Sequence, residues 1–511
     1  MTKKTELSVA FLMSLCFIFS VSYFTGALFS GHHFTEDYEY FEIQDHLASG
    51  EGVLKTIVEY TRKDYQRIRI YYAHRVLQTA LFGTNVTPMR IQIGLMGALA
   101  LFFLYLFARS LKASPPASFL FAALSLAGAP MLVWWRMATA ENLGMFFLAA
   151  SLAFMASEPL FILSITLMSF SKESFTVIVP SLLFLKVWLS AENLRLTLWE
   201  SLKKNAVSLA IVSVATVAQS LFIANVTGTV IAGYVGYEGF DWERFFSTFK
   251  QLALPPNALL CAVTAGAVIL SAFFGKNKLA VLRKMAVLFI FFFTMTLPIV
   301  LLFQKTGIVD NYLLPGVFAF TFFFLYTYQL TKNRLPLWVR AALFLLAGIV
   351  LAVHLNAAVK SARVFAEEGK TAERLVETLK EKTNPDDLIL IAADPARNLE
   401  WSHATNLYLT RLARRKNLYL FPAMRLKYSS FEKYLIYYSP ESPVVLYKGR
   451  LFGDIKNLQD IRAIVVLPYS GLWFLLGSRK WFDKNAFERI QIGEILVYYK
   501  PASGEAIAPA A

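Results

Sequence analysis

Four short segments carry acidic, basic or phenolic side chains at the ends of apolar runs. Ionisable groups at mid-bilayer cost about 2.5–3.5 kcal/mol each on insertion scales, so those that remain near a span are candidates for function. Carboxylates in such positions suit general acid–base chemistry, and a lysine or arginine suits the binding of a phosphate. The segments are 31-GHHFTEDYEYF, 135-WRMATAENLG, 171-SKES and 310-DNYLLPG.

The first segment places the acidic pair Glu36 and Asp37 directly after the first apolar run. A carboxylate held just outside a bilayer can act as a general base on a sugar or protein hydroxyl. The structural alternative is an acidic turn that caps the helix that follows. The residues alone leave both interpretations open.

The other three segments contribute Glu141, Lys172 and Tyr312. Lys172 at a membrane surface is a suitable phosphate ligand, and Glu141 is a second acid at the start of an apolar run. Each has a structural alternative: Glu141 complements a helix dipole, Lys172 is neutralised by Glu173, and Tyr312 belongs to an interfacial aromatic belt. The functional interpretation therefore depends on the four segments taken together rather than on any one of them.

The long outer loop from 31 to 88 is rich in basic residues and also contains histidines. The basic residues suit either an amphipathic helix on the membrane surface or a site for an anionic lipid head group. No histidine spacing typical of a zinc site occurs, so no cofactor is assigned and a divalent metal is left open. The basic residues are Arg62, Lys63, Arg67, Arg69 and Arg75, and the histidines are His32, His33, His46 and His74.

Composition places most of the chain in lipid. Of its 511 residues 56% are hydrophobic, and the mean hydropathy is +0.50. A soluble protein of this size is far less apolar. The two cysteines, Cys16 and Cys261, lie in apolar runs, which excludes a disulfide framework. The net charge of +15 is read as a set of topology signals, not as a nucleic-acid surface.

Uncharged stretches long enough to cross a bilayer, which takes about 20 residues, alternate with basic loops. We expect spans at 7–30, 91–108, 113–135, within 205–237, and at 251–275, 285–304, 311–331 and 341–359. Shorter apolar runs at 142–157, 159–171 and 174–190 suit short tilted helices or re-entrant segments. With them, the sequence predicts an α-helical polytopic membrane protein of about eleven spans.

Basic residues in short loops are retained on the cytoplasmic side of a membrane. About eleven spans place the basic clusters at 109–112, 195–204, 276–284 and 332–340 on the same side as Lys3 and Lys4. The N-terminus is therefore expected inside and the C-terminal region outside. All four candidate segments then lie on the extracytoplasmic face, in a multi-pass protein of a bacterial inner or plasma membrane.

After the predicted transmembrane domain (1–355), the composition becomes that of a soluble domain. Strand-like runs alternate with helix-like runs over 356–500, which predicts a small extracytoplasmic α/β domain, and 501–511 is expected to be a disordered tail. This domain shows no phosphate loop or nucleophile elbow, so an accessory role is favoured. The strand-like runs are 387–393, 417–423, 443–449, 462–468 and 493–499, and the helix-like runs are 363–382, 398–415, 428–438 and 478–488.

The order of these motifs resembles that of the C-type (GT-C) integral membrane glycosyltransferases, especially the branch of the protein O-mannosyltransferases and the lipid A aminoarabinose transferase. Members have an acidic motif in a long first outer loop, matched by Glu36-Asp37, and a second acid heading span four, matched by Glu141. A turn with a lysine before an apolar run ending in proline is matched at Lys172, and a late Tyr-Leu-Leu-Pro motif begins at Tyr312. Glu173-Ser174 and Asp310-Asn311 depart from the pattern.

The resemblance implies an enzyme that moves a sugar from a polyprenyl-phosphate donor to a hydroxyl of a lipid, glycan or protein. Asp37 is then the base, supported by Glu36 and Glu141, and a single displacement inverts the anomeric centre. The residues expected to bind the donor phosphate are Lys172, Arg67, Arg69 and Tyr312. The main alternative is a multi-span transporter or lipid flippase, and a sensor or scaffold is a third.

Overall fold

The computed structural model describes residues 2–63, 69–137, 139–230, 242–253, 255–273, 278–303, 310–331, 335–394, 399–423 and 450–501. It divides into two compact units, neither of which is continuous in sequence. The first, here called the helical unit, contains Met1–Leu28, Tyr65–Arg75 and Pro88–Ala362. The second, here called the mixed unit, contains Phe29–Asp64, Val76–Thr87 and Arg363–Ala511.

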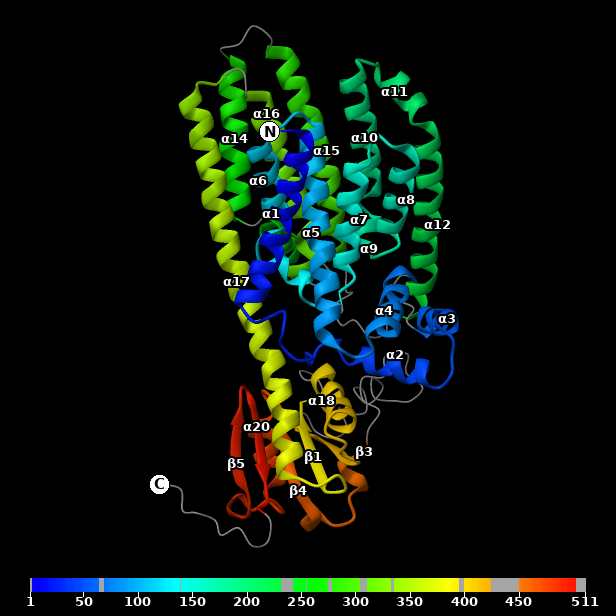
Figure 1. Cartoon of the computed structure of the whole chain (residues 1–511), viewed down its shortest axis with the longest axis vertical. Helices are drawn as coiled ribbons and strands as arrows, with labels where there is room; N and C mark the ends of the chain where they lie inside the picture. The colour runs from blue at the N-terminus through cyan, green and yellow to red at the C-terminus, as the bar shows by residue number, and fades with distance from the viewer. Residues whose placement is uncertain are drawn as a thin grey trace. The chain divides into compact units, whose positions relative to one another are not determined.

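Apolar helices make up the helical unit, as the composition predicts (Figure 1). Backbone groups in lipid must pair within their own segment, which favours helices wherever the chain crosses hydrocarbon. The helices are α1 (Lys3–Phe24), α5 (Val86–Ser110), α6 (Pro115–Leu126), α7 (Glu141–Ala153), α8 (Glu158–Ser169), α9 (Glu173–Thr176), α10 (Val179–Leu194), α11 (Leu198–Lys204), α12 (Ala206–Val230), α13 (Trp242–Ala253), α14 (Pro255–Phe273), α15 (Lys278–Phe303), α16 (Leu314–Thr331) and the first part of α17 (Leu337–Lys382).

Among the described residues, five helices are long and apolar enough to cross a membrane, and up to seven if each of two bent pairs is counted as one span. The bent pairs are α11 with α12, at 70°, and α13 with α14, at 76°. Further apolar helices of 10–17 residues include α7 and α8. A polytopic helical membrane protein is therefore confirmed, whereas the count of about eleven and the inside–outside orientation stay predictions.

The predicted span at 113–135 is wrong as a single helix. Helix α6 ends at Leu126, and a 3-10 helix, η1, occupies Ala129–Trp134. Between them Gly128 has a φ of +105°, a conformation that L side chains rarely adopt. Gly128 and Pro130 therefore end the helix despite an unbroken apolar sequence. Similarly, η3 (Asp310–Leu313) precedes α16, and it lies beside η1.

The described residues of the mixed unit form a six-stranded sheet in the order β3-β2-β1-β4-β6-β5. The strands β1 to β4 run parallel to one another. Near the other edge, β6 runs antiparallel to both of its neighbours, β4 and β5. Four predicted strands are confirmed, whereas the strand-like run 443–449 and the helix-like run 428–438 lie outside the described residues. The strands are β1 (Leu388–Ala393), β2 (Asn417–Pro422), β3 (Arg450–Leu451), β4 (Ile461–Val466), β5 (Glu488–Ile492) and β6 (Ile495–Tyr499).

One predicted helix of this unit is wrong. The run 478–488 was expected to be helical, but the helix α20 occupies Gly471–Ser478, and β5 begins at Glu488. The segment 471–478 is apolar on all sides and lacks the amphipathic periodicity of a helix, so its sequence does not indicate α20. The predicted helix at 363–382 forms, but as the end of α17, a continuous helix of 46 residues.

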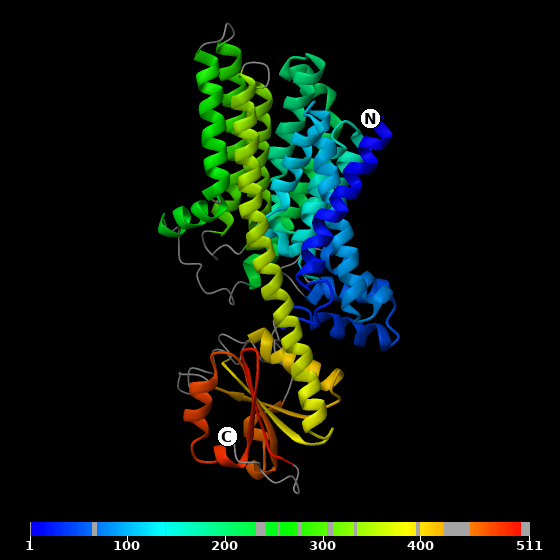
Figure 2. The same ribbon diagram turned by 60° about the vertical axis from the view of Figure 1, so that its left-hand side comes forward.

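Different elements cover the two faces of the sheet (Figure 2). One face packs against the end of α17 and against α18 (Leu399–Arg411), and the other packs against α20 and a group of aromatic side chains. The first face also buries Phe34, Tyr38 and Phe41, which come from the long first loop. Burying such aromatic side chains contributes about 1.5–3 kcal/mol each. The loop is therefore an integral part of the mixed unit, together with α2 (Glu39–Ala48) and α3 (Val53–Lys63).

Candidate active site

Asp37 lies in a tight turn just before α2 and is fully buried, with 0% of its surface exposed. Its Oδ2 accepts a hydrogen bond of 2.9 Å from the backbone N–H of His33. Its Oδ1 is buried and has no hydrogen-bond partner among the described residues. One oxygen is thus held in place while the other keeps its lone pairs for a proton, which is the arrangement that a general base requires.

Glu36, the other member of the acidic pair, has a φ of +62°. Residues other than glycine seldom adopt this left-handed conformation, and such strain of about 1–3 kcal/mol persists only where the surroundings impose it. The strained residue directly precedes Asp37, so the turn fixes the direction of the Asp37 side chain. Glu36 is half-buried.

Helix α18 of the mixed unit holds this turn from the side. The hydroxyl of Tyr408 donates to the carbonyl oxygen of His33, the residue whose N–H binds Asp37. The ring of Phe34 stacks on Trp401 with centroids 4.4 Å apart. His33 Nδ1 also lies 3.3 Å from Glu368 Oε1 on α17. The sequence did not reveal these partners, because they lie far along the chain from the loop.

The pKa of Tyr40 reflects the burial and the charges around the turn. Burial, and then the charges of Asp37 and Glu36, raise the pKa of Tyr40 well above its ordinary value. Its hydroxyl therefore stays protonated and donates a 2.9 Å hydrogen bond to Gln78 Oε1.

Three residues predicted from separate segments meet in the helical unit. The ammonium of Lys172 forms an ion pair with Glu141 Oε1. The same ammonium lies 3.8 Å from the centre of the Tyr312 ring, a cation–π contact. Glu141 begins α7, Lys172 precedes α9, and Tyr312 lies in η3, so broken helices supply all three. We call this group the Lys172 cluster.

The Lys172 cluster keeps its cation charged although it is largely buried. Burial lowers the pKa of Lys172, but the carboxylates of Glu141 and Glu173 outweigh burial, and the pKa is raised. The side chain is still 15% exposed. A charged and accessible ammonium next to an aromatic ring can bind a phosphate oxygen.

Neighbours of the Lys172 cluster carry buried polar atoms that lack a hydrogen-bond partner in the part of the chain that the structure describes. They are Thr139 Oγ1, Asn142 Nδ2 and Ser174 Oγ. Leaving a buried polar group unsatisfied costs about 1–3 kcal/mol, so such atoms often mark the place of a ligand or water. No sequence pattern singles them out as candidates, although each lies within two residues of Glu141 or Lys172.

The remaining predicted residues cannot be added to either group. Arg67 lies outside the described residues. Arg69 begins α4 (Arg69–Phe82), and the structure describes its backbone only. The structure thus brings Glu141, Lys172 and Tyr312 together in the helical unit, and it holds Asp37 and Glu36 in one turn of the mixed unit.

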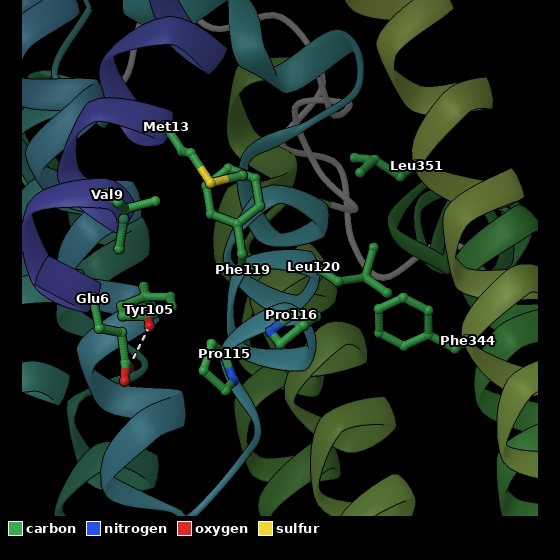
Figure 3. Close-up of a pocket in the computed structure, with 11 residues that line it drawn as sticks. Glu6, Val9, Met13, Tyr105, Pro115, Pro116, Phe119, Leu120, Phe344 and Leu351 are labelled. Carbon is green, nitrogen blue, oxygen red and sulfur yellow. Dashed lines mark hydrogen bonds between the residues drawn. The ribbon is translucent and has the colours of Figure 1, made fainter. Parts of the chain in front are cut away.

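An apolar cavity of about 360 Å³ lies elsewhere in the helical unit, between α1, α5, α6 and α17 (Figure 3). Its one acidic lining residue, Glu6, accepts hydrogen bonds of 2.6 Å from the Tyr105 hydroxyl and from Arg109 Nε. The carboxylate is thereby occupied, and the rest of the lining is apolar apart from that hydroxyl. This cavity therefore offers no group for acid–base chemistry.

The fold of the chain, membrane helices with a small C-terminal sheet, is similar to that of two solved structures of ArnT. The chain is similar to ArnT from Cupriavidus metallidurans bound to undecaprenyl phosphate, with a TM-score of 0.54 and 13% identity over 96% of this chain and 98% of that chain. ArnT in the apo state gives a TM-score of 0.53 and 12% identity over 97% and 98%. At 12–13% sequence identity, this similarity shows a shared fold alone. No family model and no curated protein matches the sequence.

Proposed function

We propose that this protein is a glycosyltransferase that moves a sugar from a polyprenyl-phosphate-linked donor to an acceptor hydroxyl on the extracytoplasmic face. The fold supports the class of reaction, and the ArnT structure of that fold holds undecaprenyl phosphate. The observation that carries the proposal is the buried Asp37, with one carboxylate oxygen anchored by His33 and the other unpaired among the described residues.

The reaction that we propose is one displacement at the anomeric carbon. Asp37 takes the proton of the acceptor hydroxyl while the hydroxyl oxygen forms the new bond to the sugar. The bond between the anomeric carbon and the phosphate oxygen breaks, and its electron pair stays with the polyprenyl phosphate. Because this leaving group departs as a stabilised anion, no general acid is needed. The product has the inverted anomeric configuration.

The Lys172 cluster supplies the positive charge that the departing phosphate requires. We propose that Lys172 and the ring edge and hydroxyl of Tyr312 face the donor phosphate, with Arg67 and Arg69 as further ligands. Glu141 orients Lys172 through their ion pair and contributes to acceptor binding. Glu36 supports the turn that carries Asp37. The acceptor is a hydroxyl of a lipid, a glycan or a protein.

The test is Asp37→Asn in proteoliposomes that contain a polyprenyl-phosphate sugar. Losing the base should lower the transfer rate by at least about 100-fold, since a positioned general base contributes 10²–10⁴-fold. The amide is nearly isosteric, so the variant should express and unfold like wild type. The matched control is Asp386→Asn, which removes a carboxylate that is 76% exposed and paired with Lys416. It should transfer at the wild-type rate.

The same experiment separates the enzyme from a transporter or flippase. A transporter moves the lipid-linked sugar across the membrane without consuming it, whereas a transferase releases polyprenyl phosphate. Wild-type release of polyprenyl phosphate by Asp37→Asn would refute the assignment of the base. Translocation without any release by the wild-type protein would favour the transporter.

A further inference from the structure

A histidine and two glutamates converge between α2 and α3 in the mixed unit. His46 lies in the last turn of α2, Glu51 in the connecting turn, and Glu59 on α3. One ligand atom from each of the three lies within 4.8 Å of the others. His46 is one of the loop histidines for which the sequence leaves a divalent metal open, but the spacing of these three residues matches no standard metal-binding motif.

The distances suit a metal ion. His46 Nδ1 lies 3.2 Å from Glu51 Oε2 and 3.9 Å from Glu59 Oε2. Two ligands of a tetrahedral zinc ion, each about 2.0–2.2 Å from the metal, are roughly 3.3–3.5 Å apart. His46 and Glu51 already have about this separation, and a small rotation of the half-buried Glu59 side chain completes the set. Three protein ligands leave one position for water.

A cation already occupies the space between the two carboxylates. Lys55 Nζ lies 3.5 Å from Glu51 Oε1 and 3.8 Å from Glu59 Oε1. Its side chain is 62% exposed, so it can turn into solvent at little cost when another cation binds. The ammonium carries one charge against two carboxylates. A divalent cation neutralises the pair completely and also uses the imidazole, which Lys55 cannot.

His46 also lines a polar cavity of about 290 Å³ within the mixed unit, together with Glu42, Asp45 and His403. His403 is buried, its Nε2 lies 3.1 Å from Glu42 Oε1, and its Nδ1 has no hydrogen-bond partner among the residues described. Arg411 also lines this cavity and pairs with Asp45, and the carboxylates of Glu42, Glu51 and Glu59 keep the surroundings of His46 acidic. This local negative potential attracts cations.

We propose that His46, Glu51 and Glu59 form a binding site for a divalent transition-metal ion of the zinc class. One imidazole and two carboxylates suit zinc, manganese or cobalt better than magnesium or calcium. The ion ties α2 to α3 and so stiffens the loop whose first turn carries Asp37. This inference does not depend on the proposed transferase reaction, because its tests measure binding and unfolding alone.

The experiment uses the full-length protein in detergent, without an affinity tag and stripped with EDTA. Zn²⁺ is titrated by calorimetry, and Co²⁺ absorption reports the coordination. We expect one equivalent to bind and the thermal unfolding temperature to rise with it. His46→Ala, Glu51→Gln and Glu59→Gln should each weaken binding by at least about tenfold. The control Asp386→Asn should bind like wild type.

Lys55→Met distinguishes a metal site from a plain ion network. If the ammonium competes with the metal, its removal should tighten Zn²⁺ binding by about three- to fivefold, the size of one exposed charge contact. In a plain ion network, Lys55→Met would leave two repelling carboxylates and no stoichiometric metal binding. Either that result, or wild-type affinity in the His46→Ala protein, would overturn the proposal. Unfolding curves of the metal-free variants establish that each is folded.

Discussion

At the scale of single residues, Lys172 shows why a lone motif is ambiguous. Its nearest charged neighbour in sequence is Glu173, which suggests a self-neutralised pair. The structure instead pairs the ammonium with Glu141 and places it over the Tyr312 ring. The charge is therefore held in a buried cluster, where an electrostatic contact to a phosphate is stronger than it is in water.

Substituting Tyr312 in two ways tests the part played by its ring. Tyr312→Leu removes the cation–π contact, worth about 0.5–2 kcal/mol, so donor KM should rise by roughly 2- to 30-fold. Tyr312→Phe keeps the ring over Lys172 and should raise KM by less. Steady-state transfer rates over a range of donor concentrations measure both. Equal KM values for the leucine variant and wild type would exclude a role for the ring in donor binding.

At the scale of elements, the turn that carries Asp37 is held by helix α18. The loop and the helix are distant in sequence, yet Tyr408 of α18 donates to the carbonyl of His33, and Trp401 stacks on Phe34. These contacts give the C-terminal domain a structural part in the proposed reaction. The accessory role favoured from its lack of catalytic motifs stays a prediction.

Tyr408→Phe should disturb the position of Asp37 without removing any group that touches substrate. The lost hydrogen bond leaves the buried His33 carbonyl with one partner fewer, at a cost of about 1–3 kcal/mol in unfolding free energy. We expect kcat to fall several-fold while donor KM stays constant. Steady-state kinetics and thermal unfolding measure the two effects.

Tyr419→Phe is the matched control for that substitution. The Tyr419 hydroxyl lies in the same unit and accepts a 3.2 Å hydrogen bond from Arg450 at an exposed position. Its loss should change neither kcat nor KM. If Tyr408→Phe lowered the unfolding temperature but kept wild-type kcat, Tyr408 would be a stability residue only.

At the scale of the whole molecule, the first loop and the C-terminal region form one compact unit, although more than 270 residues separate them at Pro88–Ala362. The predicted boundary at 355/356 falls inside the continuous helix α17. The proposed base and the Lys172 cluster belong to different units. The predicted orientation requires that the mixed unit lies on the extracytoplasmic side of the membrane.

Single cysteines test that orientation in a background with Cys16 and Cys261 replaced by alanine. Asp386→Cys, at a position 76% exposed in the mixed unit, should react with a membrane-impermeant maleimide on intact spheroplasts. Lys204→Cys, at an exposed position in a predicted cytoplasmic loop, should react only after permeabilisation. Fluorescence of the labelled band measures both. The opposite pattern would place the C-terminal domain inside and rule out an extracytoplasmic site.

The sequence alone showed that lipid surrounds most of the chain, and it predicted the class of fold and the individual candidate site residues. Long apolar runs dictate membrane helices because unpaired backbone groups cannot be buried in lipid, and short strand-like apolar runs in the C-terminal region identified most of the sheet. Local signals of this kind also singled out Asp37, Glu141, Lys172 and Tyr312 as residues that cost energy where they lie.

Only the tertiary structure decided which candidates meet and what holds them. The Lys172 cluster joins three segments, and the Asp37 turn depends on α18, contacts that no local pattern encodes because they depend on packing between distant parts of the chain. The convergence of His46, Glu51 and Glu59 could not be predicted for a related reason. Its ligands come from two helices and the turn between them, so their convergence follows from the angle of α2 to α3 and not from their spacing.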